Sequence, residues 1–290
     1  MYNSVFISSF GSNIYETTGA LESVKDKLRN TVIWNTIGSS SLIVFLKILG
    51  FNFQQTFEHL RNFHLSHTFI NGYCIIPEDE DEKRKVISGW LIEKIEINNL
   101  ISKETTLAEI FKLTNIFPNF IVWSRTGEKL CCLNPKTTPK ISIIDSILAT
   151  LTCIGVHSEF SINGDTFSGY FSGGFYPHDK NFTLENKEMN TLYIGHNSSA
   201  FFNELEADSP FSYIENEMIR QFTECNNTVV NTLTNDNIMI IYNDIYRRSM
   251  TDLKKDFCYE NGKIQGDNYA SGLSNEEYYK QKKLEIMNQN

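Results

Sequence analysis

A chain of 290 residues is long enough to bury a sizeable core, and a formal net charge of −9 argues against nucleic acid as its main partner. Phosphate binding needs clustered Lys and Arg, whereas 35 acidic residues outnumber 26 basic ones here and no basic cluster is visible. The first residues show neither a basic start nor a long apolar run, so we expect an intracellular protein with no secretory signal and no transmembrane segment.

The sequence predicts no cofactor and no metal site. The six cysteines include no CxxC pair and no repeated spacing, and the histidines are scattered, so no pattern of metal ligands is present. The chain also lacks the Gly-Lys loop with which nucleotide-binding proteins hold phosphates. We therefore expect the cysteines to be reduced thiols in the core.

The first fifty residues alternate between strand and helix. Residues 4–8 form a short apolar run that ends near Gly11, which is typical of a buried strand in a parallel sheet. Helical spacing of apolar residues over 18–29, a strand over 31–36 and a buried helix over 42–49 follow. This order of elements predicts an α/β fold.

The middle of the chain combines helices with hairpins. Residues 51–115 are expected to be mainly helical, with the charged run 78–85 as a solvated loop or a helix start. The sequence Asn163-Gly164-Asp165 is a strong signal for a hairpin turn. The expected elements are strands at 120–124 and 129–133, a helix at 141–151, strands at 160–162 and 166–167, a loop at 169–177 and a strand at 191–194.

The last third is more polar. Helices are expected at 211–225 and 245–257 on either side of a strand at 237–242, and an exposed helix at 275–287. We therefore predict an α/β domain over residues 1–200 and a helical, polar C-terminal extension over 201–290.

One segment carries a chemical pattern, the serine cluster Gly38-Ser39-Ser40-Ser41 between a predicted strand and a predicted helix. A nucleophile elbow requires this context, because it exposes a serine hydroxyl on a strained turn above a helix N-terminus that stabilises negative charge. A serine cluster before a helix is more often a simple N-cap. The segment alone therefore leaves both interpretations open.

Several segments in the same order resemble the patatin-like phospholipase family, whose members are serine acyl hydrolases with a Ser-Asp dyad. The resemblance covers about residues 4–194. It is carried by Gly19-Ala20-Leu21, Ile37-Gly38-Ser39-Ser40-Ser41, Leu49-Gly50, the runs 134–139 and 141–152, Gly155, Phe160-Ser161-Ile162-Asn163-Gly164 and Tyr170-Phe171-Ser172-Gly173-Gly174. It implies a mainly parallel central sheet flanked by helices, with a mostly helical C-terminal extension.

The resemblance places the nucleophile at Ser40 and shows that the catalytic motifs are degenerate. The family's Gly-x-Ser-x-Gly corresponds to Gly38-Ser39-Ser40-Ser41-Leu42, where Leu42 replaces the second glycine. Its Asp-Gly-Gly corresponds to Ser172-Gly173-Gly174, so the catalytic aspartate is replaced by Ser172. Its glycine-rich oxyanion loop aligns with residues 9–14, which keep only Gly11 and lack the basic residue.

These replacements predict a loss of activity. A serine hydroxyl is a poor nucleophile until a positioned base takes its proton, and losing such a base costs on the order of 10⁴ in rate. Losing one oxyanion donor costs roughly 10² to 10³ more, although the factors do not simply multiply. The residues considered as replacement bases are His157, Asp165, His178, Asp179 and His196. We expect each to be a surface or structural side chain, because proximity in sequence does not establish hydrogen-bond reach.

Three hypotheses follow. The first is a pseudoenzyme, a patatin-like scaffold for binding, assembly or a structural role, with a lipid or acyl ligand and other proteins as candidate partners. The second is an active serine acyl hydrolase that uses Ser40 with a non-standard base. The third is an unrelated α/β binding protein, for which a sheet without a strand-to-helix turn at Ser40 would be the evidence.

Overall fold

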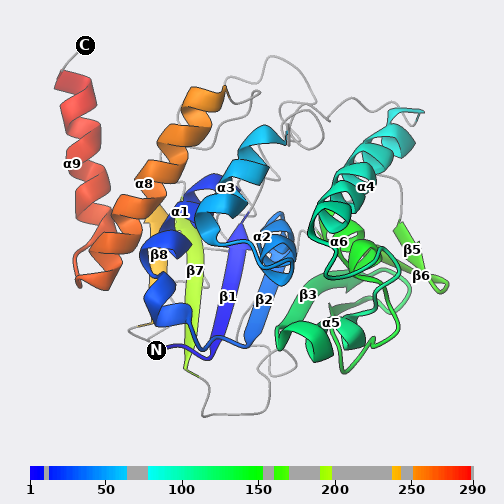
Figure 1. The fold of residues 1–290 in the computed structure, drawn as a ribbon. Helices are drawn as coiled ribbons and strands as arrows, with labels where there is room; N and C mark the ends of the chain where they lie inside the picture. The colour runs from blue at the N-terminus through cyan, green and yellow to red at the C-terminus, as the bar shows by residue number, and fades with distance from the viewer. Residues whose placement is uncertain are drawn as a thin grey trace.

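The computed structural model describes residues 1–9, 13–63, 78–152, 160–169, 190–197, 237–242 and 251–288. Figure 1 shows a central sheet with helices α1, α2, α3 and α8 in front of it. The hairpin of β5 and β6 lies at one end of the sheet and β8 at the other.

The sheet is mixed and mostly parallel, as the sequence predicts. Of its eight strands, all but β4 follow the order β5-β6-β3-β2-β1-β7-β8, and β4 pairs with β3 off this path. The five strands β3, β2, β1, β7 and β8 are parallel to one another, whereas β4, β5 and β6 are antiparallel additions. The strands are β1 (Ser4–Ser9), β2 (Ile33–Gly38), β3 (Phe117–Ser124), β4 (Lys129–Leu133), β5 (Phe160–Ile162), β6 (Asp165–Ser168), β7 (Thr191–Asn197) and β8 (Ile238–Tyr242).

The helices begin and end at residues with clear local causes. Capping boxes start α3 at Asn52 and α5 at Thr106, and α5 ends where Asn115 adopts a left-handed conformation. The helices are α1 (Asn13–Ser23), α2 (Ser40–Ile48), α3 (Phe53–Asn62), α4 (Glu78–Asn98), α5 (Leu107–Thr114), α6 (Ile143–Leu151), α8 (Asp252–Ala270) and α9 (Asn275–Asn288), with a 3-10 turn at Lys25–Leu28 after α1.

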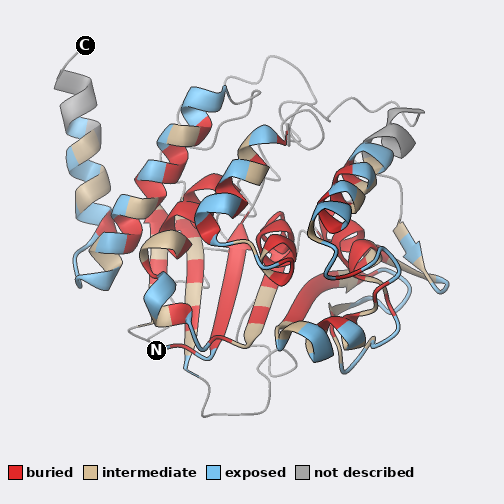
Figure 2. Ribbon diagram, viewed as in Figure 1, coloured by how far each residue is buried: buried red, intermediate tan, exposed pale blue. Residues whose placement is uncertain are grey.

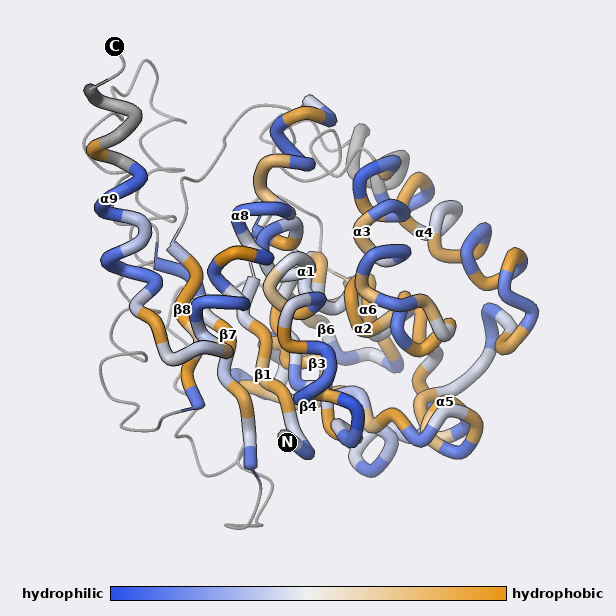
Figure 3. Tube along the Cα trace, turned by 60° about the vertical axis from the view of Figure 1, so that its left-hand side comes forward, coloured by the Kyte–Doolittle hydropathy of each residue, from blue (hydrophilic) through white to orange (hydrophobic). Residues whose placement is uncertain are grey.

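The core lies between the sheet and these helices. Alternate residues of the central strands, among them Ile7, Trp34 and Phe120, join the buried side chains of the helices in one large cluster. Helix α2 is buried on nearly every side, as an apolar helix in the middle of a layer must be. Figure 2 shows the buried strands and α2, and Figure 3 shows that α9 is more hydrophilic than the strands.

Helices α1 and α8 approach each other closely through glycines. A Cβ atom at Gly19 would lie 2.0 Å from the Tyr259 carbonyl oxygen, and one at Gly262 would lie 2.0 Å from the Glu16 carbonyl oxygen. Only residues without a side chain allow this contact. Because β8 also pairs with β7, the region predicted as a C-terminal extension contributes to the same sheet and the same core.

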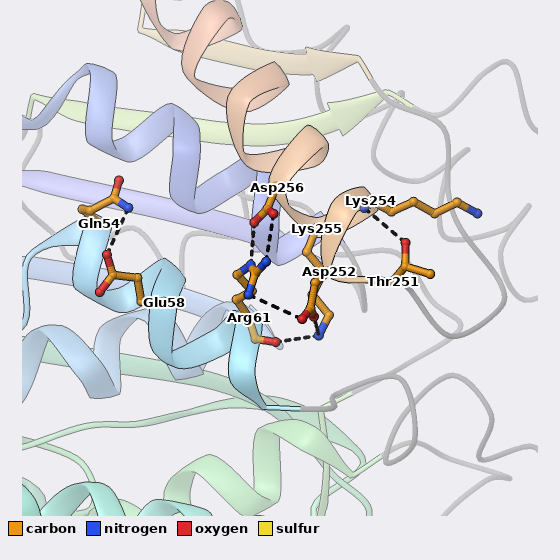
Figure 4. Close-up of polar contacts among 8 residues, drawn as sticks. All are labelled: Gln54, Glu58, Arg61, Thr251, Asp252, Lys254, Lys255 and Asp256. Atoms are coloured by element: carbon orange, nitrogen blue, oxygen red, sulfur yellow. Dashed lines mark hydrogen bonds and ion pairs between the residues drawn. The ribbon is translucent and has the colours of Figure 1, made fainter.

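Polar contacts hold α8 to the end of α3 (Figure 4). The Arg61 guanidinium donates to both carboxylate oxygens of Asp256, at 2.6 and 3.0 Å. The fully buried Lys255 ammonium donates to the Arg61 carbonyl oxygen at 2.5 Å and lies 3.3 Å from Asp252. Lys255 therefore satisfies a carbonyl at the C-terminal end of α3, where helices favour a positive charge.

Two predicted helices have different boundaries. The helix predicted over 18–29 begins earlier, at Asn13, and ends at Ser23. The helix predicted over 245–257 is α8, which continues to Ala270, because its glycines pack against α1 despite their low helix propensity. The helix predicted over 211–225 lies outside the described residues.

Candidate functional site

The candidate site lies at the carboxyl ends of β1 and β2, the position where open parallel sheets bind ligands. Ser9 and Gly38 end these two strands and pair with each other in the ladder. Helix α2 starts at Ser40, two residues after β2 ends. A strand-to-helix turn is therefore present where the sequence predicts one.

The sharp bend of this turn falls on Gly38. Gly38 has a φ of 60°, a left-handed conformation that favours glycine, whereas Ser39 has an ordinary helical conformation. In a nucleophile elbow the reactive serine occupies the strained turn itself, so that its hydroxyl is exposed. Here the residue at the bend has no side chain, and Ser40 belongs to the first turn of the helix.

The Ser40 hydroxyl is bound to the backbone. Ser40 is fully buried, and its Oγ accepts a hydrogen bond from the Ile37 amide at 3.1 Å. Its single hydrogen is directed at the carbonyl oxygens of Ile37, at 2.7 Å, and Ile7, at 3.0 Å. Within the described part of the chain, no carboxylate or imidazole contacts this hydroxyl.

The neighbouring serines make similar structural contacts. Ser39 donates to the Ser9 carbonyl oxygen at 3.2 Å, and the two hydroxyl oxygens are 3.4 Å apart. Ser41 accepts a hydrogen bond of 2.8 Å from Thr150 at the end of α6. All three serines of the cluster are buried. Together they tie the start of α2 to β1 and α6.

His196, one of the considered bases, lies on β7 and is also buried. Its Nε2 lies 2.8 Å from the Thr17 hydroxyl, and Thr17 donates its single hydrogen to the Asn13 carbonyl oxygen. This hydrogen bond between His196 and Thr17 ties β7 to α1. Burial lowers the pKa of His196 to about 3, so the imidazole is neutral near pH 7.

Asp165, another considered base, contacts a different serine. Both of its carboxylate oxygens accept hydrogen bonds from the Ser124 hydroxyl, at 2.8 and 2.9 Å. The Ser124 Oγ accepts a further bond of 2.9 Å from the Gly127 amide, and Ser124 is fully buried. The bond from Gly127 closes the β3–β4 turn, and the pair with Asp165 ties this turn to the start of β6. The sequence carries a hairpin signal at Asp165, and no local pattern predicts its contact with Ser124, 41 residues away in the chain.

Other predicted site residues lie outside the described residues. They are Gly11 of the oxyanion loop, Ser172, Gly173 and Gly174 of the aspartate motif, and the considered bases His157, His178 and Asp179. Their roles remain predictions from the sequence.

The described residues contain no group of three or more His, Cys, Asp or Glu side chains that would hold a metal ion. Burial raises the pKa of the Cys132 thiol to about 12, so this cysteine is protonated near pH 7. None of the described helices combines the length and apolar character needed to cross a bilayer.

Comparison with known proteins identifies the fold. No protein-family model matches the sequence, and no curated protein matches it. Among solved structures, VipD from Legionella pneumophila matches with a TM-score of 0.54 over 93% of this chain and 67% of that chain, at 11% identity. The mostly parallel sheet with flanking helices and a helical C-terminal part is thus a patatin-like fold, as in VipD.

Two further structures match more weakly. The type III effector ExoU matches with a TM-score of 0.43 at 11% identity, over 93% of this chain and 53% of that chain. The ExoU–SpcU complex from Pseudomonas aeruginosa matches with a TM-score of 0.42 at 10% identity, over 93% of this chain and 51% of that chain. This chain therefore spans about half the length of the ExoU chains.

Proposed function

We propose that this chain is a catalytically inactive patatin-like protein, whose scaffold serves binding, assembly or a structural role. The observation that supports the proposal most strongly is the state of Ser40, whose buried hydroxyl is bound to backbone groups of β1 and β2. In this role the serine stabilises the start of α2 and has no reaction to perform.

The chemistry of acyl transfer supports this assignment. A serine nucleophile needs access to the substrate and a base within hydrogen-bond reach. To attack an ester, the Ser40 hydroxyl would have to leave its present backbone partners and become accessible from its buried position. Sequence resemblance adds that the partner aspartate is replaced by Ser172.

The bend at Gly38 is a second, independent support. A nucleophile elbow exposes the side chain of the residue at the bend. The residue at this bend is a glycine, which has no side chain to expose. Leu42 is also fully buried where the family has a small residue, so bulk fills the space behind the turn. A lipid or acyl ligand and other proteins are the partners that we propose for the scaffold.

The alternative is an active serine acyl hydrolase that uses Ser40 with a non-standard base. Hydrolysis of short-chain esters and of phospholipid vesicles, measured for the native chain, Ser40→Ala and Ser41→Ala, separates the two. Ser41 is a matched control, because it is buried in the same helical turn and is not the residue aligned with the nucleophile. We expect the same background rate for all three. Turnover that disappears only in Ser40→Ala would establish the hydrolase.

A further inference from the structure

Strand β8 is the last strand of the described sheet, and its composition is that of an edge strand to which another strand can readily add. Its sequence, Ile238-Met239-Ile240-Ile241-Tyr242, is apolar and uncharged and contains no proline. Among the described strands, it pairs with β7 on one side and with none on the other. An edge strand of this kind presents unpaired backbone groups to which another strand can add, and proteins normally protect it.

The ladder with β7 shows which backbone groups of β8 point outward. The Asn237 carbonyl accepts a hydrogen bond from the Tyr193 amide, so residue 237 faces β7. Backbone groups alternate in direction along a strand, and residues 239 and 241 therefore also face β7. The amide and carbonyl groups of Ile238, Ile240 and Tyr242 point away from the sheet.

Side-chain amides from the two C-terminal helices occupy three of these outward groups. The Gln265 amide nitrogen on α8 donates to the Tyr242 carbonyl at 2.8 Å, and the Gln265 oxygen accepts from the Tyr242 amide at 2.7 Å. This pair of bonds is what a neighbouring strand would offer. At the start of α9, the Asn275 amide nitrogen donates to the Ile240 carbonyl at 2.9 Å.

The positions of both side chains fit this capping role. Gln265 is fully buried and Asn275 is 9% exposed, so neither amide is a solvated surface group. The Tyr242 ring also packs against Tyr279 of α9, with ring centroids 5.9 Å apart. Helices α8 and α9 thus meet the same edge through polar and aromatic contacts.

We propose that Gln265 and Asn275 form an amide cap on β8 that prevents this edge from pairing with β8 of a second copy of the chain. Two identical edges related by a twofold axis would pair antiparallel, an arrangement that needs the outward groups of Ile240 and Tyr242. Within one chain, the cap occupies both groups of Tyr242 and the Ile240 carbonyl. Strand addition can proceed only when the cap is removed.

The test is sedimentation velocity of the full-length chain and of the double variant Gln265→Met, Asn275→Leu, with circular dichroism to establish that each is folded. These substitutions keep side-chain size and remove the hydrogen bonds. We expect the double variant to form a species of about twice the native mass, with self-association at least about tenfold tighter than that of the native chain. A folded double variant that sediments like the native chain would overturn the proposal.

Two further variants separate edge pairing from general destabilisation. Adding Ile240→Lys to the double variant places a charge on the edge, and we expect it to restore native sedimentation. Leu107→Ala removes a fully buried side chain from α5, remote from β8, and leaves the cap intact. Association of Leu107→Ala equal to that of the double variant, or association that persists with Ile240→Lys, would contradict the proposal. If the double variant does not fold, the single variant Gln265→Met is measured in its place, and the same outcomes support or contradict the proposal.

Discussion

Replacing Gly262 with alanine should force helices α1 and α8 apart. The new Cβ atom would lie 2.0 Å from the Glu16 carbonyl oxygen and 2.7 and 2.8 Å from the Glu16 carbonyl carbon and Cα. All three are backbone atoms of a buried helix, so no flexible side chain can move aside. To reach a normal contact of about 3.5 Å, the helices must separate by about 1.5 Å.

The expected loss of stability follows from two opposing terms. Overpacking of this kind costs about 3 kcal/mol, and the higher helix propensity of alanine returns about 1 kcal/mol. We therefore expect Gly262→Ala to lower the free energy of unfolding by about 2 kcal/mol, measured by urea denaturation with circular dichroism.

Gly89 on α4 provides a matched control. It is an exposed helical glycine, and a Cβ atom there would meet nothing within 4 Å. Gly89→Ala should therefore raise the free energy of unfolding by about 1 kcal/mol. Equal stabilisation by Gly262→Ala and Gly89→Ala would refute the close contact between α1 and α8.

Two other substitutions test buried polar groups. Because the pKa of His196 is about 3 in the folded chain and about 6.5 when unfolded, its contribution to stability is complete above pH 6.5 and is lost as the pH falls toward 3. Between pH 7 and pH 5 the native chain should lose about 2 kcal/mol more than His196→Gln, and equal losses in urea denaturation would contradict this assignment. Lys255→Met removes the charged donor to the Arg61 carbonyl and should lower the free energy of unfolding by about 1–3 kcal/mol. A Lys255→Met chain as stable as the native one would contradict this prediction, because the desolvation of Lys255 would then cancel its hydrogen bond.

Much of the fold could be predicted from local sequence signals. The turn at Asn163-Gly164 is an example, because both residues adopt a positive φ, as the sequence suggests, and the hairpin of β5 and β6 is confirmed. The full length of α8 could not be predicted, since Gly262 and Gly266 lower helix propensity and their benefit comes from packing against α1. That contact joins residues far apart in the sequence.

The geometry of the serine cluster was also only partly predictable. The order strand, turn, helix was correct, but β2 continues two residues beyond its predicted end, to Gly38. This extension places the bend on Gly38 and Ser40 within the helix. The glycine at position 38 was the signal in the sequence for a bend at that residue, because glycine most readily adopts a positive φ. The hydrogen bond from Ser40 to Ile7 depends on the pairing of β1 with β2, which no local pattern reveals.

The most direct test of an inert Ser40 is its reaction with a fluorophosphonate probe, followed by intact-mass measurement and peptide mapping of the folded chain. A buried hydroxyl whose partners among the described residues are backbone groups should not react, so we predict an unchanged mass and an unmodified Ser40 peptide. A phosphonyl adduct on Ser40, formed by the folded chain and by Ser41→Ala but absent from Ser40→Ala, would contradict the account.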